Sequence, residues 1–236
     1  MEIKAVLFDL DGTLLPMDYD KFIEYYFGLL AKKMAGMGYE PTDIVKNIWK
    51  STKAMVMNDG SCKNEEAFWR SFAEIYGEKV LQDKPAFDAF YANEFEQVQV
   101  ACGFTSSAKE IVELVKNSDR MAVLATNPLF PATATRARIR WAGLSTEDFR
   151  LYTTYENSCH CKPNTKYYLD ICEEIGCKPE ECLMVGNDVD EDMIAETIGM
   201  KIFLLTDCII NKSGQDISKY PNGGFKELEE YIKQLK

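Results

Sequence analysis

Short runs of apolar residues alternate along the chain with longer segments in which apolar side chains recur every three or four positions. Apolar runs of this length are typical of strands buried on both faces, and the longer segments are typical of amphipathic helices. The runs predict strands at residues 3–8, 121–125, 183–185 and 202–205, with a further candidate at 149–153. The longer segments predict helices at residues 107–116, 164–174, 191–198 and 225–235. This alternation is typical of an α/β fold, with a parallel sheet and helices on both of its faces.

Residues 17–100 follow a different pattern, with helical periodicity and almost no strand signal. Apolar residues share one helical face in successive segments, as Phe22, Tyr26 and Leu30 do in the first. Stretches with glycine, proline and polar residues separate the segments. We therefore predict a four-helix insert after the first strand. The chain would then have an α/β core domain, made of residues 1–16 and 101–236, and a helical domain made of residues 17–100.

Composition narrows the class of protein. Of the 236 residues, 46% are hydrophobic and 28% are charged, which is the balance of a globular protein with a sizeable core. The net charge of -11 argues against nucleic acid or an anionic membrane as a partner, because both attract clustered lysine and arginine. A small soluble ligand is the better candidate. Nothing in the sequence indicates the oligomeric state.

The eight cysteines are expected to be reduced thiols of a cytoplasmic protein. The amino terminus has no signal-peptide pattern, and no apolar run reaches the roughly 18 residues needed to cross a bilayer. Cys159-His160-Cys161 contains the only histidine and invites a zinc or redox interpretation. No pair of cysteines in this region has the spacing of a zinc knuckle, so small apolar thiols are the simpler interpretation.

Two carboxylates follow the first predicted strand, in the run Asp9-Leu10-Asp11-Gly12-Thr13. An open parallel sheet usually has its ligand crevice at this end of its strands. An ionised aspartate near a metal can attack phosphorus, while a second carboxyl group can hold a proton and donate it to the leaving oxygen. Taken alone, such a run is more often a polar turn or part of a calcium-binding loop.

Further polar residues lie near the ends of later predicted elements. Thr126 and Asn127 end the second predicted strand, where a hydroxyl and backbone N–H groups can hold phosphate oxygens. Lys162 precedes a predicted helix, and its ammonium could neutralise a phosphoryl group. A strand-ending turn and a solvated surface lysine are the alternatives. Residues 183–192 run from an apolar strand into a cluster of acids. Such a cluster could bind Mg²⁺, but acids in the first turn of a helix are also favoured by the helix dipole alone.

These four runs, in this order along the chain, resemble the four signatures of the haloacid dehalogenase superfamily. The resemblance spans nearly the whole chain and implies a Rossmann-like core, with the helical insert as a cap domain. It implies that Asp9 is the nucleophile and that Asp11 is the acid and base, with the Asp11 backbone carbonyl on the metal. Lys162 would neutralise both the nucleophile and the phosphoryl group. The resemblance also implies Mg²⁺ as cofactor and substrate contacts from Gly12, Thr126, Asn127 and Lys162.

The fourth run departs from the usual spelling of its signature. Asn187 occupies the place after Gly186 where an aspartate is usual, and the acid follows one residue later as Asp188. Both are candidate metal ligands beside Asp9 and Asp11, and its charge favours Asp188. Asp192 is expected to hold Lys162 or a metal-bound water.

The resemblance implies a phosphatase that hydrolyses a small phosphorylated metabolite through an aspartyl-phosphate intermediate. A sugar-phosphate mutase of the same superfamily shares the core chemistry and is one alternative. A non-catalytic metal or phosphate sensor, suggested by Asn187 and the cysteine cluster, is another. A carbon–halogen hydrolase is disfavoured by Asp11, which such enzymes do not need. Candidate substrate contacts in the insert are Tyr19, Lys53, Asn58 and Arg70.

Overall fold

The computed structural model describes residues 2–235 and contains one parallel sheet in the strand order β3-β2-β1-β4-β5-β6. The strands are β1 (Ala5–Phe8), β2 (Met121–Leu124), β3 (Leu151–Tyr152), β4 (Cys182–Gly186), β5 (Lys201–Leu205) and β6 (Asn222–Gly223). The predicted α/β fold with a parallel sheet is confirmed, and each predicted strand overlaps one of β1 to β5. The edge strand β6 was not predicted, because it is short and has no apolar side chain.

The α-helices are α1 (Tyr19–Ala35), α2 (Pro41–Val56), α3 (Asn64–Tyr76), α4 (Lys84–Ala92), α5 (Ser107–Lys116), α6 (Ala132–Trp141), α7 (Thr165–Ile175) and α8 (Phe225–Gln234). Short 3₁₀ helices are η1 (Glu78–Asp83), η2 (Glu94–Ala101), η3 (Thr146–Asp148), η4 (Pro179–Glu181), η5 (Met193–Ile198) and η6 (Ile217–Lys219). Three helices predicted after residue 100 match α5, α7 and α8, and α6 was missed. The helix predicted at residues 191–198 is present as the 3₁₀ helix η5 rather than as an α-helix, and it begins at Met193, after a loop tied by Asp188 and Asp192.

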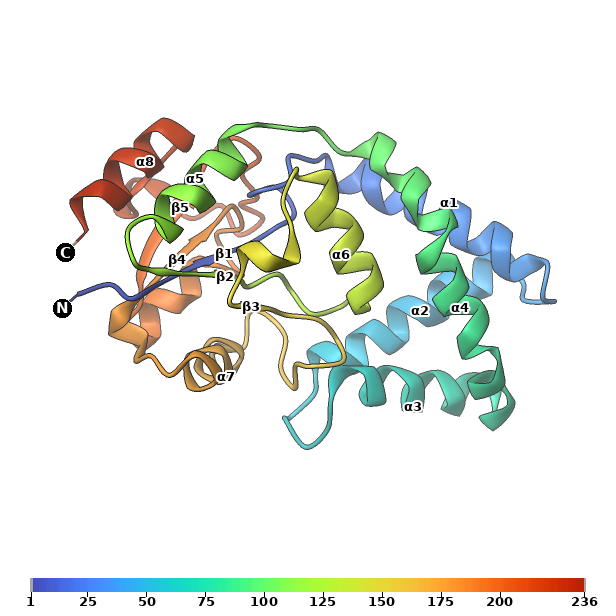
Figure 1. Ribbon diagram of the computed structural model, residues 1–236. Coiled ribbons are helices and arrows are strands. Elements are labelled where there is room, and N and C mark those ends of the chain that lie inside the picture. Colours follow the sequence, from blue (N-terminus) through green and yellow to red (C-terminus); the bar gives the residue numbers. More distant parts are fainter. Residues whose placement is uncertain (1, 236) are drawn as a thin grey trace.

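The sheet separates two layers of helices, because successive side chains of a strand point to opposite faces. In β1, Val6 and Phe8 join an apolar cluster that includes residues of α5 and α8. Ala5 and Leu7 join a second cluster, formed with α7 and η5. Figure 1 shows α5 and α8 over one face of the sheet and α7 over the other. Burial on both faces explains why β1 is apolar throughout.

Between β1 and β2 the chain forms α1 to α4, which lie together on the opposite side of the molecule from the two termini (Figure 1). The apolar faces of α1 to α4 belong to the same apolar cluster as Val6 and Phe8 of β1. Phe22, Tyr26 and Phe95 pack around Phe130, from the loop after β2, with ring centroids 6.2, 5.3 and 6.2 Å from it. The insert is therefore joined to the rest of the chain by aromatic packing. None of the helices in residues 2–235 is both long enough and apolar enough to cross a membrane.

Candidate active site

A pocket of about 110 Å³ lies at the carboxyl ends of β1, β2 and β4. These three strands are neighbours in the sheet, so the loops that follow them meet at one edge. The pocket brings together most of the residues singled out in the sequence. Its lining includes Asp9, Asp11, Thr126, Asn127, Asn187, Asp188 and Asp192.

Lys162 supplies a buried positive charge to this pocket from the loop before α7. Its side chain is 1% exposed, and its Nζ lies 2.8 Å from Asp9 Oδ1 and 2.6 Å from Asp192 Oδ1. Burial alone would lower the pKa of Lys162, but the carboxylates of Asp192 and Asp9 outweigh it and hold that pKa well above its usual value. Lys162 therefore remains an ammonium ion that links the loop after β1 to the loop after β4.

Both polar atoms of the Asn187 side chain make hydrogen bonds within the protein. Its Nδ2 donates a hydrogen bond to the Cys208 carbonyl at 2.7 Å, and its Oδ1 lies 2.9 Å from Thr13 Oγ1. The backbone of Gly12 passes directly over this amide, since a Cβ at Gly12 would lie 2.3 Å from Asn187 Nδ2. Gly12 also has a φ of 86°, which favours glycine. Both polar atoms of Asn187 thus join neighbouring loops.

Asp188 has a different arrangement. Its Oδ1 accepts hydrogen bonds from the backbone N–H groups of Asp190 at 2.8 Å and Glu191 at 2.9 Å. Its backbone N–H donates to Asp192 Oδ2 at 3.0 Å. No hydrogen bond to Asp188 Oδ2 occurs within residues 2–235, so this oxygen is available to a ligand in the pocket. The geometry favours Asp188 over Asn187 as a cation ligand.

Arg138 on α6 is a charged residue of this region that the sequence analysis missed. It is fully buried, and its Nη1 makes a short ion pair with Asp11 Oδ2. Its guanidinium carbon lies 4.5 Å from the centroid of the Phe130 ring. Asp11 Oδ1 is buried and has no hydrogen-bond partner within residues 2–235. Burial raises the pKa of Asp11, and Arg138 opposes this shift only in part.

No sequence signal marked Arg138. It lies between the exposed Arg136 and Arg140, so the segment is typical of a solvated basic stretch rather than of a helix that buries an arginine. In the helix, these alternating arginines point in different directions, because residues two apart do not share a face. Of the three, Arg138 alone is buried, against Asp11 and Phe130.

Thr126 and Asn127 lie at the pocket as expected, and Glu191 joins them. Asn127 Nδ2 donates to Glu191 Oε2 at 2.9 Å, while Asn127 Oδ1 is buried without a partner in the described part of the chain. Burial raises the pKa of Glu191 to about 6. The Thr126 carbonyl accepts hydrogen bonds from Thr153 Oγ1 at 2.6 Å and Tyr167 Oη at 2.9 Å. These bonds fix the backbone that would face a phosphate.

The candidates from the insert are dispersed. Tyr19, the first residue of α1, lines the pocket. Asn58 is buried elsewhere and donates to the Cys62 carbonyl and to Asn64 Oδ1, both at 2.9 Å. Lys53 and Arg70 are exposed on α2 and α3. Tyr19 alone of these candidates lines the pocket.

None of the residues of the Cys159-His160-Cys161 run lines this pocket. His160 Nδ1 is 2.6 Å from Asp170 Oδ2, and all eight cysteines are free. Across residues 2–235, no group of three or more histidine, cysteine, aspartate and glutamate side chains is placed to hold a metal ion.

The fold and the pocket can be compared with known proteins. The family model of the haloacid dehalogenase-like hydrolases, which describes their sequences, matches residues 3–195 of this chain. The chain belongs to this family. The predicted membership of the haloacid dehalogenase superfamily is therefore confirmed, and with it the prediction of a hydrolase.

Relatives of this haloacid dehalogenase-like hydrolase match it over nearly their whole length. A glyceraldehyde 3-phosphate phosphatase of Methanothermobacter thermautotrophicus is 25% identical over 99% of this chain and 98% of its own. A HAD phosphatase from Thermococcus onnurineus is 21% identical, with a TM-score of 0.58 and 98% of both chains covered. A magnesium-bound HAD hydrolase from Bacillus subtilis is 15% identical, with a TM-score of 0.56, and 98% of this chain and 99% of that one are covered. The two structures establish the shared fold.

Proposed function

We propose that the protein is a Mg²⁺-dependent phosphatase that hydrolyses a small soluble phosphate monoester through an aspartyl-phosphate intermediate. The observation that carries this proposal is the setting of Asp9, which lines the pocket at the end of β1 and whose Oδ1 lies 2.8 Å from the ammonium of Lys162, buried behind it. A carboxylate beside a fixed cation suits a nucleophile that must approach an anionic phosphoryl group. The name of the glyceraldehyde 3-phosphate phosphatase supports the same reaction class.

In the first half-reaction, an Asp9 oxygen attacks phosphorus, the bond between phosphorus and the ester oxygen breaks, and Asp11 gives its proton to the departing alcohol. In the second, Asp11 takes a proton from water, the water oxygen attacks phosphorus, and inorganic phosphate leaves Asp9. Arg138 holds Asp11 Oδ2, so the proton would sit on Oδ1, which is buried and has no hydrogen-bond partner within residues 2–235, and the side chain would turn toward the leaving oxygen to deliver it. Lys162 offsets the charge that gathers around Asp9.

The pocket fits Mg²⁺. This ion binds through one or two carboxylates and completes its coordination with water and phosphate oxygens, so it does not require a larger cluster of acidic side chains. Asp9 and Asp188 would supply the carboxylates and Asp11 its backbone carbonyl, and all three residues line the pocket. Asn187 would remain behind them as a link between loops. When bound, the ion would neutralise phosphoryl oxygens and make phosphorus more electrophilic.

We further propose that residues 17–100 act as a cap domain over a core of residues 1–16 and 101–236. Tyr19 of α1 lines the pocket together with core residues, so closure of the insert would remove water from the site. A small phosphorylated metabolite is the expected partner. The free thiols of the eight cysteines favour a reducing, cytoplasmic setting.

The test is hydrolysis of a generic aryl phosphate, with and without Mg²⁺, by the parent protein and by Asp9→Asn. We expect Mg²⁺-dependent release of phosphate that falls by at least about 10³-fold in Asp9→Asn, because the amide is a poor nucleophile of nearly unchanged size. Asp20→Asn, on the exposed side of α1, is the matched control and should retain activity. Retained turnover in Asp9→Asn would refute covalent catalysis by Asp9. Metal or phosphate binding without any turnover would indicate a sensor instead.

A further inference from the structure

The insert meets the core at the start of α3 as well as around Phe130. The backbone N–H of Asn64 donates to the Ser158 carbonyl at 2.9 Å. The backbone N–H of Glu65 donates to the Tyr155 carbonyl, also at 2.9 Å. Both carbonyls belong to the loop between β3 and α7. The first turn of α3 is therefore docked on the β3–α7 loop.

The side chain of Asn64 is fully buried at this junction. Its Nδ2 lies 3.3 Å from the His160 carbonyl, 3.2 Å from Cys161 Sγ and 3.5 Å from the Pro128 carbonyl. Its Oδ1 accepts a hydrogen bond from Asn58 Nδ2 at 2.9 Å, which fixes the direction in which the amide faces. Since Pro128 follows β2, one amide of the insert contacts both the β3–α7 loop and the loop after β2.

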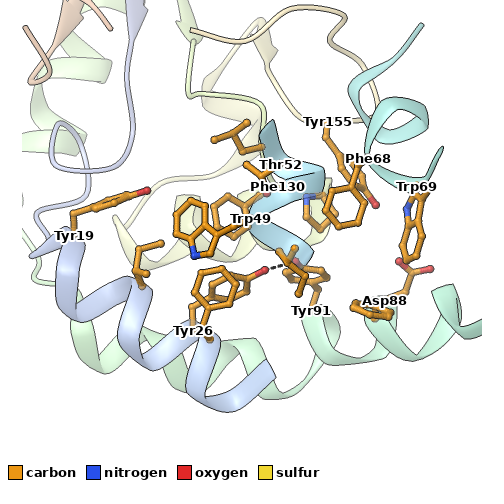
Figure 2. A pocket seen from close by; sticks show the side chains of 16 residues that line it. Tyr19, Tyr26, Trp49, Thr52, Phe68, Trp69, Asp88, Tyr91, Phe130 and Tyr155 are labelled. Carbon is orange, nitrogen blue, oxygen red and sulfur yellow. Dashed lines mark hydrogen bonds between the residues drawn. The ribbon is translucent and has the colours of Figure 1, made fainter. Parts of the chain in front are cut away.

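Cys161 completes the junction from the side of the core. Its Sγ donates to the Met55 carbonyl of α2 at 3.5 Å. Burial raises the pKa of Cys161 to about 12, so the thiol keeps the proton that it donates. Met55, Tyr155 and Cys161 form an apolar cluster separate from the two that flank the sheet, and Phe68 packs against it. Figure 2 shows Phe68 and Tyr155 close together where α3 meets the core.

His160 packs against the loop between α2 and α3. Its ring is buried, and its Nδ1 lies 2.6 Å from Asp170 Oδ2 on α7. Gly60 covers the other edge of the ring, since a Cβ at Gly60 would lie 2.6 Å from His160 Nε2. His160 and Cys161 of the run singled out in the sequence thus both contact the insert.

Lys162 lies in a segment without regular structure. Residues 153–164 connect β3 to α7 and contain neither strand nor helix. Their position therefore depends on hydrogen bonds and packing with neighbouring elements. Because Lys162 follows Cys161 directly, a shift of the junction would also move the backbone of Lys162.

We propose that Asn64 is a positioning residue for Lys162. The Lys162 ammonium stays between Asp9 and Asp192 only while Asn64 holds the β3–α7 loop against the insert. This inference rests on the proposed phosphatase function and adds to it a residue that does not line the pocket.

The first experiment uses Asn64→Asp, which keeps the size of the side chain but turns an oxygen toward the His160 carbonyl. An acid suits the first turn of α3, so the change acts on the junction rather than on the helix. We expect kcat for a generic aryl phosphate with Mg²⁺ to fall at least about tenfold, because a misplacement of about 1 Å can cost about 10²-fold. Asn47→Asp is the matched control and should retain activity, since Asn47 bonds within the insert to Tyr76 Oη. An unchanged kcat in Asn64→Asp would overturn the inference.

The labelling of single side chains, read by mass spectrometry, separates a local effect from a general loosening of the fold. Cys161 is 1% exposed beside Asn64, whereas Cys172 is 3% exposed in the cluster between the sheet and α7. In Asn64→Asp, alkylation of Cys161 by iodoacetamide should accelerate at least about tenfold and that of Cys172 should not change. Acetylation of Lys162 should accelerate with that of Cys161, because its ammonium would leave its two carboxylates. Equal acceleration at both thiols would mean that Asn64 supports the whole fold, which contradicts the inference.

Gly60→Ala keeps the inference testable if Asn64→Asp does not fold. Its new Cβ would push the insert away from His160, so kcat and the labelling of Cys161 should change as in Asn64→Asp. Gly38→Ala is the control, because Gly38 has a φ of 92° against 94° at Gly60, and a Cβ there would meet no described atom within 4 Å. Equal activity of the two alanine variants would count against the junction. Failure of the proposed function looks different: the parent would then release no phosphate with Mg²⁺, while the labelling would still change.

Discussion

The ion pair between Arg138 and Asp11 should be measurable as a coupling free energy. The Arg138 side chain is 1% exposed and that of Asp11 is 22% exposed, so the pair is largely removed from water. Removing one member of a buried pair typically costs about 3–5 kcal/mol, mainly because the other charge remains buried without a partner. Arg138→Met also loses a 3.3 Å hydrogen bond to Thr135 and the contact with Phe130. We expect this variant to lose about 3–4 kcal/mol of stability.

Asp11→Asn keeps the size and one acceptor oxygen, and the partial exposure of the site lets water reach it, so we expect a loss of about 1–3 kcal/mol. The double variant no longer contains a buried unpaired charge. It should be more stable than the sum of the single losses by about 2 kcal/mol. Lys109 and Glu113, whose side chains are 60% and 55% exposed at 3.8 Å, form the control pair and should couple by no more than about 0.5 kcal/mol.

The assay is equilibrium unfolding in urea, followed by circular dichroism and by tryptophan fluorescence. Free energies can be compared only if the two probes give the same transition, since the insert could unfold separately. A coupling for Arg138 and Asp11 as small as that of the control pair would refute the reasoning. It would mean that the guanidinium is stabilised by its contacts within α6 and with Phe130, independently of Asp11.

Three further predictions concern the same pocket. Lys162→Met leaves Asp9 and Asp192 buried without their cation, so it should abolish phosphate release and cost about 3–5 kcal/mol in urea unfolding, whereas Lys166→Met on exposed α7 surface should do neither. Gly12→Ala should lower the melting temperature more than Gly38→Ala. Both glycines have a positive φ, but only at Gly12 would the new Cβ clash with another residue, because it would lie 2.3 Å from Asn187 Nδ2. Asp188→Asn should weaken Mg²⁺ binding in calorimetry by more than about tenfold, while Asn187→Ala should mainly lower stability; the reverse pattern would make Asn187 the metal ligand.

The fold was predictable where burial leaves a simple pattern. β1 and β4 are buried along their whole length, so they read as continuous apolar runs. α6 could not be found in this way, because Arg138 is buried in an ion pair and removes the apolar signal from the inner face of the helix. Hydrophobic periodicity detects burial that is driven by apolar surface, and it fails where a charge is buried with its partner.

The candidate site was likewise predictable from the sequence only in part. Asp9, Thr126 and Asp188 were predictable because each comes at or just beyond the end of a strand of one parallel sheet, where loops must meet. The contacts of Asn187 were not, since Thr13 and Cys208 approach it only through the three-dimensional path of their loops. Charge already favoured Asp188 over Asn187 in the sequence, and the hydrogen bonds of the two side chains add a geometric reason for the same preference.

The charges around the pocket give a further argument for a divalent cation. Carboxyl groups of Asp9, Asp11, Glu191 and Asp192 gather here with that of Asp188, while Lys162 and Arg138 are the buried cations. Lys162 is already paired with two carboxylates and Arg138 with one, so neither has charge to spare for an incoming phosphate. Lys212 also lines the pocket without an ion pair within residues 2–235, but it is exposed, and one exposed lysine does not offset the five carboxyl groups. The net charge of -11 on the whole chain adds to the repulsion. A phosphate dianion would enter this pocket at a large electrostatic cost unless a divalent ion arrived before it or with it, which supports the proposal that Mg²⁺ is part of the working site.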